Sequence, residues 1–417
     1  MRLRCRLLAP SQRPLRICFI SPYPPEKEGV ADYLALLVKT LITTDPRVEI
    51  TVISQVDNSV SYNSEYIGQH LRIIRTWKPN SLASLLRIRS FLVRQKFDWV
   101  HLQYGPYGKY GGVLGEPLLL LFAGLRRHAK TAITLHTIWF PEGLGIRLRQ
   151  KYRLNAPSAK IIFLCFQVFL RVFCHLFDRI ILLTHTTDRR IANIVSSVFR
   201  VENQRLEEWI LPFKEPTFET SRRSEQNRSK VNRSIVILCP GFISPRKGID
   251  TLLNAFQLLP SHESIRLRFV GQTLTKEDRN LLRRLTGLVT QSTLDGLVEF
   301  VTNGVDGNVI EQEARDSDVI VLPSAYRVGP SSLICRLAGY GVPIVTTYDP
   351  VFLPPGTTVP LRLVPPNDPP ALAEAIWAVA SNVTIHKSIS EQLQRWAMEN
   401  QYTRHARLHL DEYRGND

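Results

Sequence analysis

Short apolar runs alternate with helix-like segments in two series along the chain, and a polar stretch separates the two series. Such runs, rich in Val, Ile, Leu and Phe, are typical of the buried strands of a parallel sheet. The runs cover residues 16–21, 49–54, 99–102, 131–136 and 179–184 in the first series, and residues 234–238, 266–270, 298–301, 319–322 and 343–346 in the second. Helical periodicity continues through residues 371–380 and 391–413.

The polar stretch, residues 214–233, reads KEPTFETSRRSEQNRSKVNR and has no apolar period, so we interpret it as a linker or an exposed loop. Strands that alternate with helices favour a doubly wound α/β fold. We therefore predict an α/β protein with two Rossmann-like doubly wound domains that face a central cleft. The expected parts are an N-terminal domain (1–213), the linker, a C-terminal domain (234–390) and a last helical segment (391–417).

Length and composition are those of an ordinary globular protein. The chain has 417 residues, 44% hydrophobic and 22% charged, which fits two or three packed domains. Its longest apolar runs, residues 118–125 and 161–170, are much shorter than the roughly 20 residues that span a bilayer. Pro10 breaks the short apolar run near the N-terminus, so a secretory signal is not expected. The six cysteines lack metal-ligand spacing. We expect a cytoplasmic protein with reduced thiols.

Positive charge is concentrated in one half of the chain. Residues 1–214 contain 31 Lys and Arg against 15 Asp and Glu, whereas residues 215–417 contain 22 of each. A basic half is typical of proteins that meet an anionic membrane surface, nucleic acid or an acidic substrate. The sequence has no zinc-finger, RNA-recognition or helix-turn-helix pattern, so a nucleic-acid partner is not expected. An anionic membrane at the cytoplasmic face and a simply solvated basic surface remain open. The basic clusters lie near Arg87, Arg126, Arg147 and Arg189.

A candidate phosphate-binding loop follows the first strand of the second series. The segment CPGFISPRKGIDTLLNAF passes from a strand through Gly241, Arg246 and Lys247 into an amphipathic helix that begins near Ile249. A strand–loop–helix edge directs backbone N–H groups and a lysine toward one point, which is how proteins hold a phosphate. An ordinary surface loop with solvated cations is the alternative interpretation.

A second loop could complete the same anion site. Gly329, Pro330, Ser331 and Ser332 have the composition of a helix start, with proline in the first turn. Such a start leaves the N–H groups of Ser331, Ser332 and Leu333 free for an anion. Together with Lys247 this loop would hold one diphosphate. An ordinary capped helix is the alternative.

Three loops of the first series also follow predicted strands, where ligands bind in open α/β sheets. Gly29 would let the backbone approach a substrate or phosphate closely, unless it serves only a tight turn. The segment HLQYGPYGKYGG supplies Tyr104 and Tyr107, whose rings and hydroxyls suit a sugar acceptor. His136 ends a strand, where its ring would donate to a substrate oxygen or serve as a structural residue.

The ordered set of these segments resembles the retaining glycosyltransferases of family 4, which have two Rossmann-like domains in the GT-B arrangement. The resemblance extends over residues 16–413. It is carried by the segments PYPPEKEGVADYLALLVKTL, DWVHLQYGPYGKYGG, TLHTIW, FDRIILLTHTTDRR, GFISPRKGIDTLLNAF, LPSAYRVGPSSL and AGYGVPIVTT.

The resemblance implies a role for each part of the chain. The N-terminal domain would hold the acceptor, the C-terminal domain would hold the nucleotide-sugar, and the last helix would cross back onto the N-terminal domain. Gly29 would lie against the donor phosphates or the acceptor. His136 would contact the transferred sugar, and Lys247 would bind the diphosphate.

The chain departs from that family at three positions. Phe242 stands where the family usually has an arginine, so Arg246 or Arg327 would have to replace that cation. Val328 and Arg336 stand where the family usually has two glutamates, of which the second accepts the ribose hydroxyls. Arginine has no acceptor to offer. Nucleotide recognition must therefore differ from the family pattern.

The predicted reaction moves a sugar from a nucleoside-diphosphate sugar to a glycan or lipid-linked acceptor, and the resemblance implies retention of the anomeric configuration. A lysine and a helix N-terminus can stabilise the charge on the departing diphosphate, so we expect no metal ion or other cofactor. His136 and Lys247 are the candidate catalytic residues. Two alternatives remain, namely a catalytically silent GT-B partner subunit in polysaccharide assembly and a sugar-nucleotide epimerase or phosphorylase.

Overall fold

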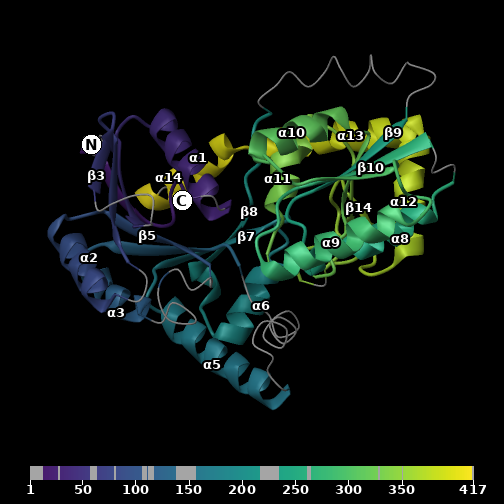
Figure 1. Cartoon of the computed structure of the whole chain (residues 1–417). Coiled ribbons are helices and arrows are strands. Elements are labelled where there is room, and N and C mark those ends of the chain that lie inside the picture. The colour runs from purple at the N-terminus through teal and green to yellow at the C-terminus, as the bar shows by residue number, and fades with distance from the viewer. Residues whose placement is uncertain are drawn as a thin grey trace, which may run out of the picture.

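The computed structural model describes residues 13–26, 29–56, 63–78, 81–105, 110, 117–137, 156–216, 234–260, 264–326, 329–349 and 351–415. These residues form two α/β domains that lie side by side (Figure 1). Each domain has a mainly parallel sheet with helices against it. The predicted architecture of two doubly wound domains is therefore confirmed.

The N-terminal sheet has eight strands in the order β3-β4-β2-β1-β5-β6-β7-β8. Neighbouring strands are parallel, apart from the antiparallel pair β3 and β4. The strands are β1 (Leu15–Ile20), β2 (Val48–Gln55), β3 (Asn63–Ile67), β4 (Leu71–Trp77), β5 (Trp99–Tyr104), β6 (Lys130–Leu135), β7 (Arg179–Thr184) and β8 (Leu206–Ile210). Of these, β3, β4 and β8 were not among the predicted strands.

Both faces of the N-terminal sheet are buried, because successive side chains of a strand point to opposite sides. In β1, Ile17 and Phe19 join one apolar core, while Cys18 and Ile20 join another. The first core includes side chains of α1 (Gly29–Thr44) and α14 (Tyr402–Arg414). The helices of the second core are α2 (Leu82–Arg94), α3 (Leu118–Phe122), α5 (Ala156–Cys174) and α6 (Arg190–Phe199).

The C-terminal sheet has six parallel strands in the order β11-β10-β9-β12-β13-β14. The strands are β9 (Ile235–Pro240), β10 (Ile265–Val270), β11 (Val298–Val301), β12 (Val319–Leu322), β13 (Ile344–Thr347) and β14 (Arg362–Val364). The helices are α8 (Ile249–Gln257), α9 (Lys276–Thr290), α10 (Gly307–Asp316), α11 (Ser332–Leu337), α12 (Pro369–Ser381) and α13 (Val383–Glu399). The order of strands reverses between β9 and β12, which makes the loops after these two strands the expected place for a ligand.

The last helix, α14, belongs spatially to the N-terminal domain. Figure 1 shows α14 beside α1, with the C-terminus among the N-terminal elements. The indole N–H of Trp99 in β5 donates to the backbone oxygen of Tyr413 (2.9 Å), and the Tyr33 hydroxyl of α1 is hydrogen-bonded to His405 (2.6 Å). The end of the chain therefore completes the core of the domain that the beginning of the chain forms.

In the ranges that the structure describes, no helix is both long enough and apolar enough to cross a lipid bilayer.

Candidate donor site between the two domains

The loop after β9 brings a lysine close to the start of α11. Gly241 has a φ of +107°, a conformation that side chains rarely adopt. A Cβ on Gly241 would lie 2.9 Å from Cδ1 of Leu333 and 3.9 Å from Nζ of Lys247. The first and second predicted walls of the anion site therefore meet at Gly241. Any side chain at this position would fill the space between the lysine and α11.

The same loop is fixed to the strand on the other side of the topological switch. Gly248 follows the short 3-10 turn that carries Lys247 and has a φ of +65°. A Cβ at Gly248 would overlap the backbone oxygen of Pro323, just after β12. The N–H of Ala325 donates to the backbone oxygen of Arg246 (2.9 Å). Glycine and backbone hydrogen bonds thus hold Lys247 against the end of β12.

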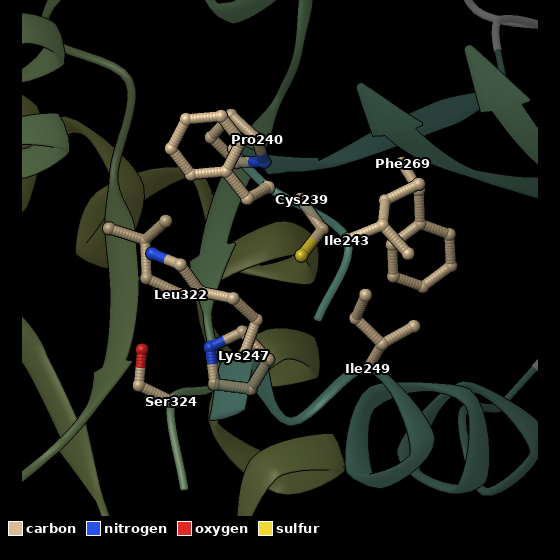
Figure 2. Close-up of a pocket in the computed structure, with 11 residues that line it drawn as sticks. Cys239, Pro240, Ile243, Lys247, Ile249, Phe269, Leu322 and Ser324 are labelled. Atoms are coloured by element: carbon tan, nitrogen blue, oxygen red, sulfur yellow. The ribbon is translucent and has the colours of Figure 1, made fainter. Parts of the chain in front are cut away.

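A small cavity lies at this junction. Figure 2 shows Lys247 between Leu322 and Ser324 on one side and Ile243 and Ile249 on the other. The cavity has a volume of about 10 Å³, which is room for roughly one water molecule. Its lining consists of Cys239, Pro240, Gly241, Phe242, Ile243, Lys247, Ile249, Phe269, Leu322, Pro323 and Ser324. Lys247 is the one cationic side chain of this lining, so an anion that enters here meets a single lysine.

The start of α11 is not wholly free for an anion, which corrects one expectation. Ser331 is the N-cap residue of α11, and its N–H donates to Nε2 of His185 (2.8 Å). His185 is buried and follows β7 of the other domain. A diphosphate that uses the Ser331 N–H must therefore displace the imidazole. Ser332 and Leu333, which we predicted as further donors, lie in the first turn of α11.

Gly329 lies where the two domains touch. A Cβ at this position would be 2.8 Å from the backbone oxygen of His136. Only glycine allows the loop before α11 to approach the end of β6 this closely. The structure thereby places the predicted residues Gly329 and His136 together. Arg327 and Val328, the neighbouring residues of the same loop, lie outside the described residues.

His136 is held by its neighbours in a neutral state. Its Nε2 is hydrogen-bonded to Oε1 of Gln103 (2.7 Å), and its ring meets the Tyr33 ring edge-on at 4.8 Å between centroids. Burial lowers the pKa of His136 to about 3, because the charged form would lose its hydration. With Nε2–H donating to Gln103, the ring offers Nδ1 as an acceptor. The expected donation from His136 to a substrate oxygen is therefore not the arrangement seen here.

Tyr104 is a core residue, which corrects its predicted contact with the acceptor. It is the last residue of β5, only 1% of its surface is exposed, and its ring packs against Tyr110 and Phe173. A substrate cannot reach this ring unless the end of β5 and the residues packed on it unfold. Tyr107, the other predicted acceptor residue, lies outside the described residues.

Gly29 begins α1 in open space. A Cβ built on Gly29 would meet no atom within 4 Å, and its φ is not in the left-handed region. Neither the backbone nor a neighbour in this conformation requires glycine here. The structure therefore shows no close approach that would require glycine, and the predicted contact of Gly29 with a substrate or phosphate stays a prediction.

Arg336 connects the two domains through carboxylates. Its Nε lies 3.2 Å from Oε1 of the fully buried Glu311, and its Nη2 lies 3.6 Å from Oδ2 of Asp32 on α1. Glu311 also accepts hydrogen bonds from Lys214 Nζ (2.6 Å) and from the Tyr340 hydroxyl (2.8 Å). In this conformation Arg336 is therefore used for contact between the domains.

Sequence reasoning missed three residues of this region: Asp32, His185 and Glu311. His185 had a usable signal, because it follows an apolar strand in the same way as His136. Asp32 and Glu311 lie within helical segments and look like ordinary surface carboxylates. Only the folded chain shows that Arg336 of α11 reaches both carboxylates, Glu311 on α10 and Asp32 on α1.

No group of three or more His, Cys, Asp or Glu side chains in the described ranges has an arrangement that could hold a metal ion.

The comparisons with known proteins agree with this geometry. Residues 234–382 match the family model described as Glycosyl transferases group 1. The structure is similar to a sucrose-phosphate synthase from Thermosynechococcus elongatus, with a TM-score of 0.70, 17% identity and coverage of 96% of this chain and 98% of that chain. No curated protein sequence matches the chain.

Two further structures share the same fold over nearly their full length. A glycosyltransferase from Rickettsia africae has a TM-score of 0.67 and 15% identity, and the match covers 96% of this chain and 98% of that chain. HepE from Anabaena in complex with UDP has a TM-score of 0.65 and 14% identity, with 95% and 99% coverage. These likenesses establish the two-domain GT-B fold. The chain therefore combines this fold with a C-terminal domain whose residues 234–382 match the group 1 glycosyl transferases.

Proposed function

We propose that this protein transfers a sugar from a nucleoside-diphosphate sugar to a glycan or lipid-linked acceptor, with retention of the anomeric configuration and without a metal ion. The observation that carries the proposal is the meeting of Lys247, Gly241 and Leu333 at the switch point of the group 1 domain. HepE, which shares the fold, has been solved with UDP and with UDP-glucose. A UDP-sugar is therefore the first donor to test.

The proposed chemistry uses the residues that the two domains bring together. The acceptor hydroxyl attacks the anomeric carbon on the face from which the diphosphate departs. The bond between the anomeric carbon and the phosphate oxygen breaks, a new bond to the acceptor oxygen forms, and a diphosphate oxygen takes the acceptor's proton. Lys247 stabilises the negative charge that develops on the diphosphate. His136 would orient the sugar through its neutral ring.

The donor proposal predicts a large effect of removing the Lys247 amino group. Lys247→Ala should weaken binding of the nucleotide-sugar by about 1.5–3 kcal/mol, the range for a hydrogen bond to a charged group. Isothermal titration with UDP-, GDP- and ADP-sugars measures this effect. Lys387→Ala, which removes an exposed lysine on α13 of the same domain, serves as the control. An unchanged affinity in Lys247→Ala would contradict the assignment.

A catalytically silent partner subunit is the second candidate, and Arg336 favours it. This side chain is paired with Glu311 and Asp32 at a position where the family usually has a ribose acceptor. The two candidates differ in turnover. A transferase releases the nucleoside diphosphate when donor and acceptor are both present, whereas a silent subunit releases none with any donor that it binds.

The charge distribution supports a further part of the proposal, a membrane-presented acceptor. The whole excess of 16 positive charges lies in residues 1–214, on the side that would hold the acceptor. Each cation near an anionic bilayer contributes roughly 1 kcal/mol of attraction. By binding the membrane surface itself, the protein would come within reach of a lipid-linked acceptor in that membrane.

A further inference from the structure

The exposed apolar side chains of the N-terminal domain are concentrated on one helical layer. Leu82 and Leu86 of α2, Leu120 of α3 and four residues of α5 are each more than half exposed. On the opposite face of the N-terminal sheet, no large apolar residue of α1 or α14 is so exposed. The layer formed by α2, α3 and α5 therefore has an outer face unlike that of the opposite layer.

Helix α5 carries a continuous apolar stripe on its outer side. Ile161, Leu164, Val168 and Val172 are 63%, 60%, 55% and 51% exposed. At 100° per residue these four side chains fall within roughly 80° of the helix surface. The opposite side of α5 is buried through Phe166, Phe169, Leu170, Phe173 and Cys174. The apolar residues of the stripe are therefore not the ones that pack α5 against the core of the domain.

The charged residues within the helices of this layer are all positive. Helices α2, α3, α5 and α6 contain no Asp or Glu in their sequences. Lys160 and Arg171 are exposed on α5 and flank the same side of the stripe about three turns apart, where long cationic side chains can reach outward. On α2, Leu86, Arg87, Phe91 and Arg94 help to line an open groove of about 460 Å³. By contrast, α1 and α14 contain Asp32, Asp411 and Glu412.

The helix is also placed for contact with a flat partner. Figure 1 shows α5 extending outward from the N-terminal domain, on the side away from α1 and α14. An exposed apolar stripe bordered by cations, without acids, is the pattern of helices that lie in the headgroup region of an anionic bilayer. A protein partner would require matching pockets and acids, whereas a lipid surface adapts to both the stripe and the cations.

We infer that the outer face of α2, α3 and α5 binds an anionic lipid bilayer, with the α5 stripe inserted among the headgroups and acyl chains. This inference rests on the membrane surface proposed above and is independent of the transfer reaction, because it concerns the outer side chains of N-terminal helices and not the Lys247 loop of the C-terminal domain. It assigns membrane attachment to the apolar stripe of α5 in addition to the positive charge of the N-terminal half.

The first test measures flotation of the full chain with vesicles of phosphatidylcholine, with and without phosphatidylglycerol. The double variant Leu164→Glu and Val168→Glu should bind anionic vesicles at least about tenfold more weakly than the natural chain, because two inserted aliphatic side chains are replaced by charges. Leu288→Glu, at a residue of α9 that is 54% exposed, is the matched control and should bind like the natural chain. Equal binding of all three proteins would overturn the inference.

The second test uses the position of Cys165 on the exposed side of α5. Among the cysteines that the structure describes, Cys165 is exposed and the others are buried. In a Cys5→Ser variant, an environment-sensitive fluorophore on Cys165 should shift to the blue with anionic vesicles and be quenched by brominated lipid chains. Absence of quenching in vesicle-bound protein would exclude insertion of α5.

Other occupants of this face give distinct results. A blue shift without vesicles that rises with protein concentration, together with a doubled mass in light scattering, would assign the face to a second copy of the chain. A large loss of thermal stability in the double variant would show that the chain itself covers the stripe. Nucleotide titrations on the same variants keep a failure of donor binding separate from a failure of membrane binding.

Discussion

The two sheets of this protein are completed by different means. The C-terminal sheet is covered by helices of its own part of the chain, α8 to α13, and its core is almost entirely aliphatic and aromatic, with Phe256 of α8 as a fully buried example. The N-terminal sheet depends on α14, which comes about 200 residues after β8. That contact is rich in histidine and tyrosine rings.

The chemistry of the α14 contact makes the N-terminal domain sensitive to conditions that the C-terminal domain should tolerate. Burial lowers the pKa of His101 and of His405 to about 3, and it also lowers the pKa of His409 well below its usual value. Neither ring nitrogen of the fully buried His409 has a hydrogen-bond partner among the described residues. A domain that closes with neutral imidazoles loses stability when they must take up protons.

The largest expected effect comes from shortening the last aromatic side chain of α14. Tyr413→Ala should reduce the free energy of unfolding by about 3–5 kcal/mol, as for other buried large-to-alanine changes. Tyr413 is 4% exposed and packs against Trp99 and His101. Hydrogen exchange should show lost protection in β5 and α1, although the substitution lies near the end of the chain.

Phe256→Ala is the matched change in the C-terminal domain. It should lower stability by a similar amount, but the lost protection should remain in β9 and β10 and their helices. If Tyr413→Ala instead exposed only α14 and left β5 protected, the view that α14 completes the N-terminal core would be wrong.

The second effect concerns the charged link between the domains. Glu311→Gln should cost about 2–3 kcal/mol, since charge-assisted hydrogen bonds are worth about 1.5–3 kcal/mol each and water partly screens Lys214 and Arg336. Urea denaturation measures this loss. Glu374→Gln, at an exposed position of α12, should change stability by less than about 0.5 kcal/mol. Equal effects of the two variants would mean that the buried carboxylate contributes little.

The last effect is a change in the dependence of stability on pH. Below pH about 6.5 the unfolded chain binds protons on its histidines, whereas the folded chain does not until about pH 3. The unfolding free energy therefore falls as the pH falls through this window, by about 1.4 kcal/mol per pH unit for each such histidine.

His409→Phe isolates one of these contributions. Between pH 6 and pH 4, the unfolding free energy of the variant should fall less steeply than that of the natural chain, by about 1.4 kcal/mol per pH unit. It should be no less stable at pH 8, because the ring that it replaces has no hydrogen bond to lose. Denaturation curves at a series of pH values measure both quantities. Parallel pH profiles for the two proteins would exclude His409 from the acid sensitivity.

Several of the strands that the sequence predicted, such as β7 and β12, are apolar along almost their whole length. Two of the strands that it missed, β4 and β8, carry buried charges that tertiary contacts satisfy. Strand β8 contains Glu208, which is buried and accepts a hydrogen bond from the backbone N–H of Ala192 in α6 (2.9 Å). Strand β4 contains the buried Arg75, whose guanidinium donates to the backbone oxygen of Pro24. A local pattern of polarity cannot report a partner that lies elsewhere in the chain.

The candidate site divides in the same way. The sequence identified Gly241, Lys247 and Gly329, because glycines and a lysine beside strand ends have a local physical meaning. It could not distinguish Tyr104, which the sheet edge buries, from a tyrosine that meets a substrate. It also gave no indication that the His185 ring would accept a hydrogen bond from the N–H of Ser331, since 146 residues separate them.

The sequence by itself determined the alternation of strands and helices, the polar stretch between the two series and the basic character of the first half, because these depend on residues close together along the chain. The tertiary structure decided which ends meet: α14 against β5, Arg336 against Asp32, and Gly329 against His136. The physical reason is that burial and ion pairing depend on distance in space. Only the folded chain brings residues about 300 positions apart, such as Trp99 and Tyr413, within hydrogen-bonding distance.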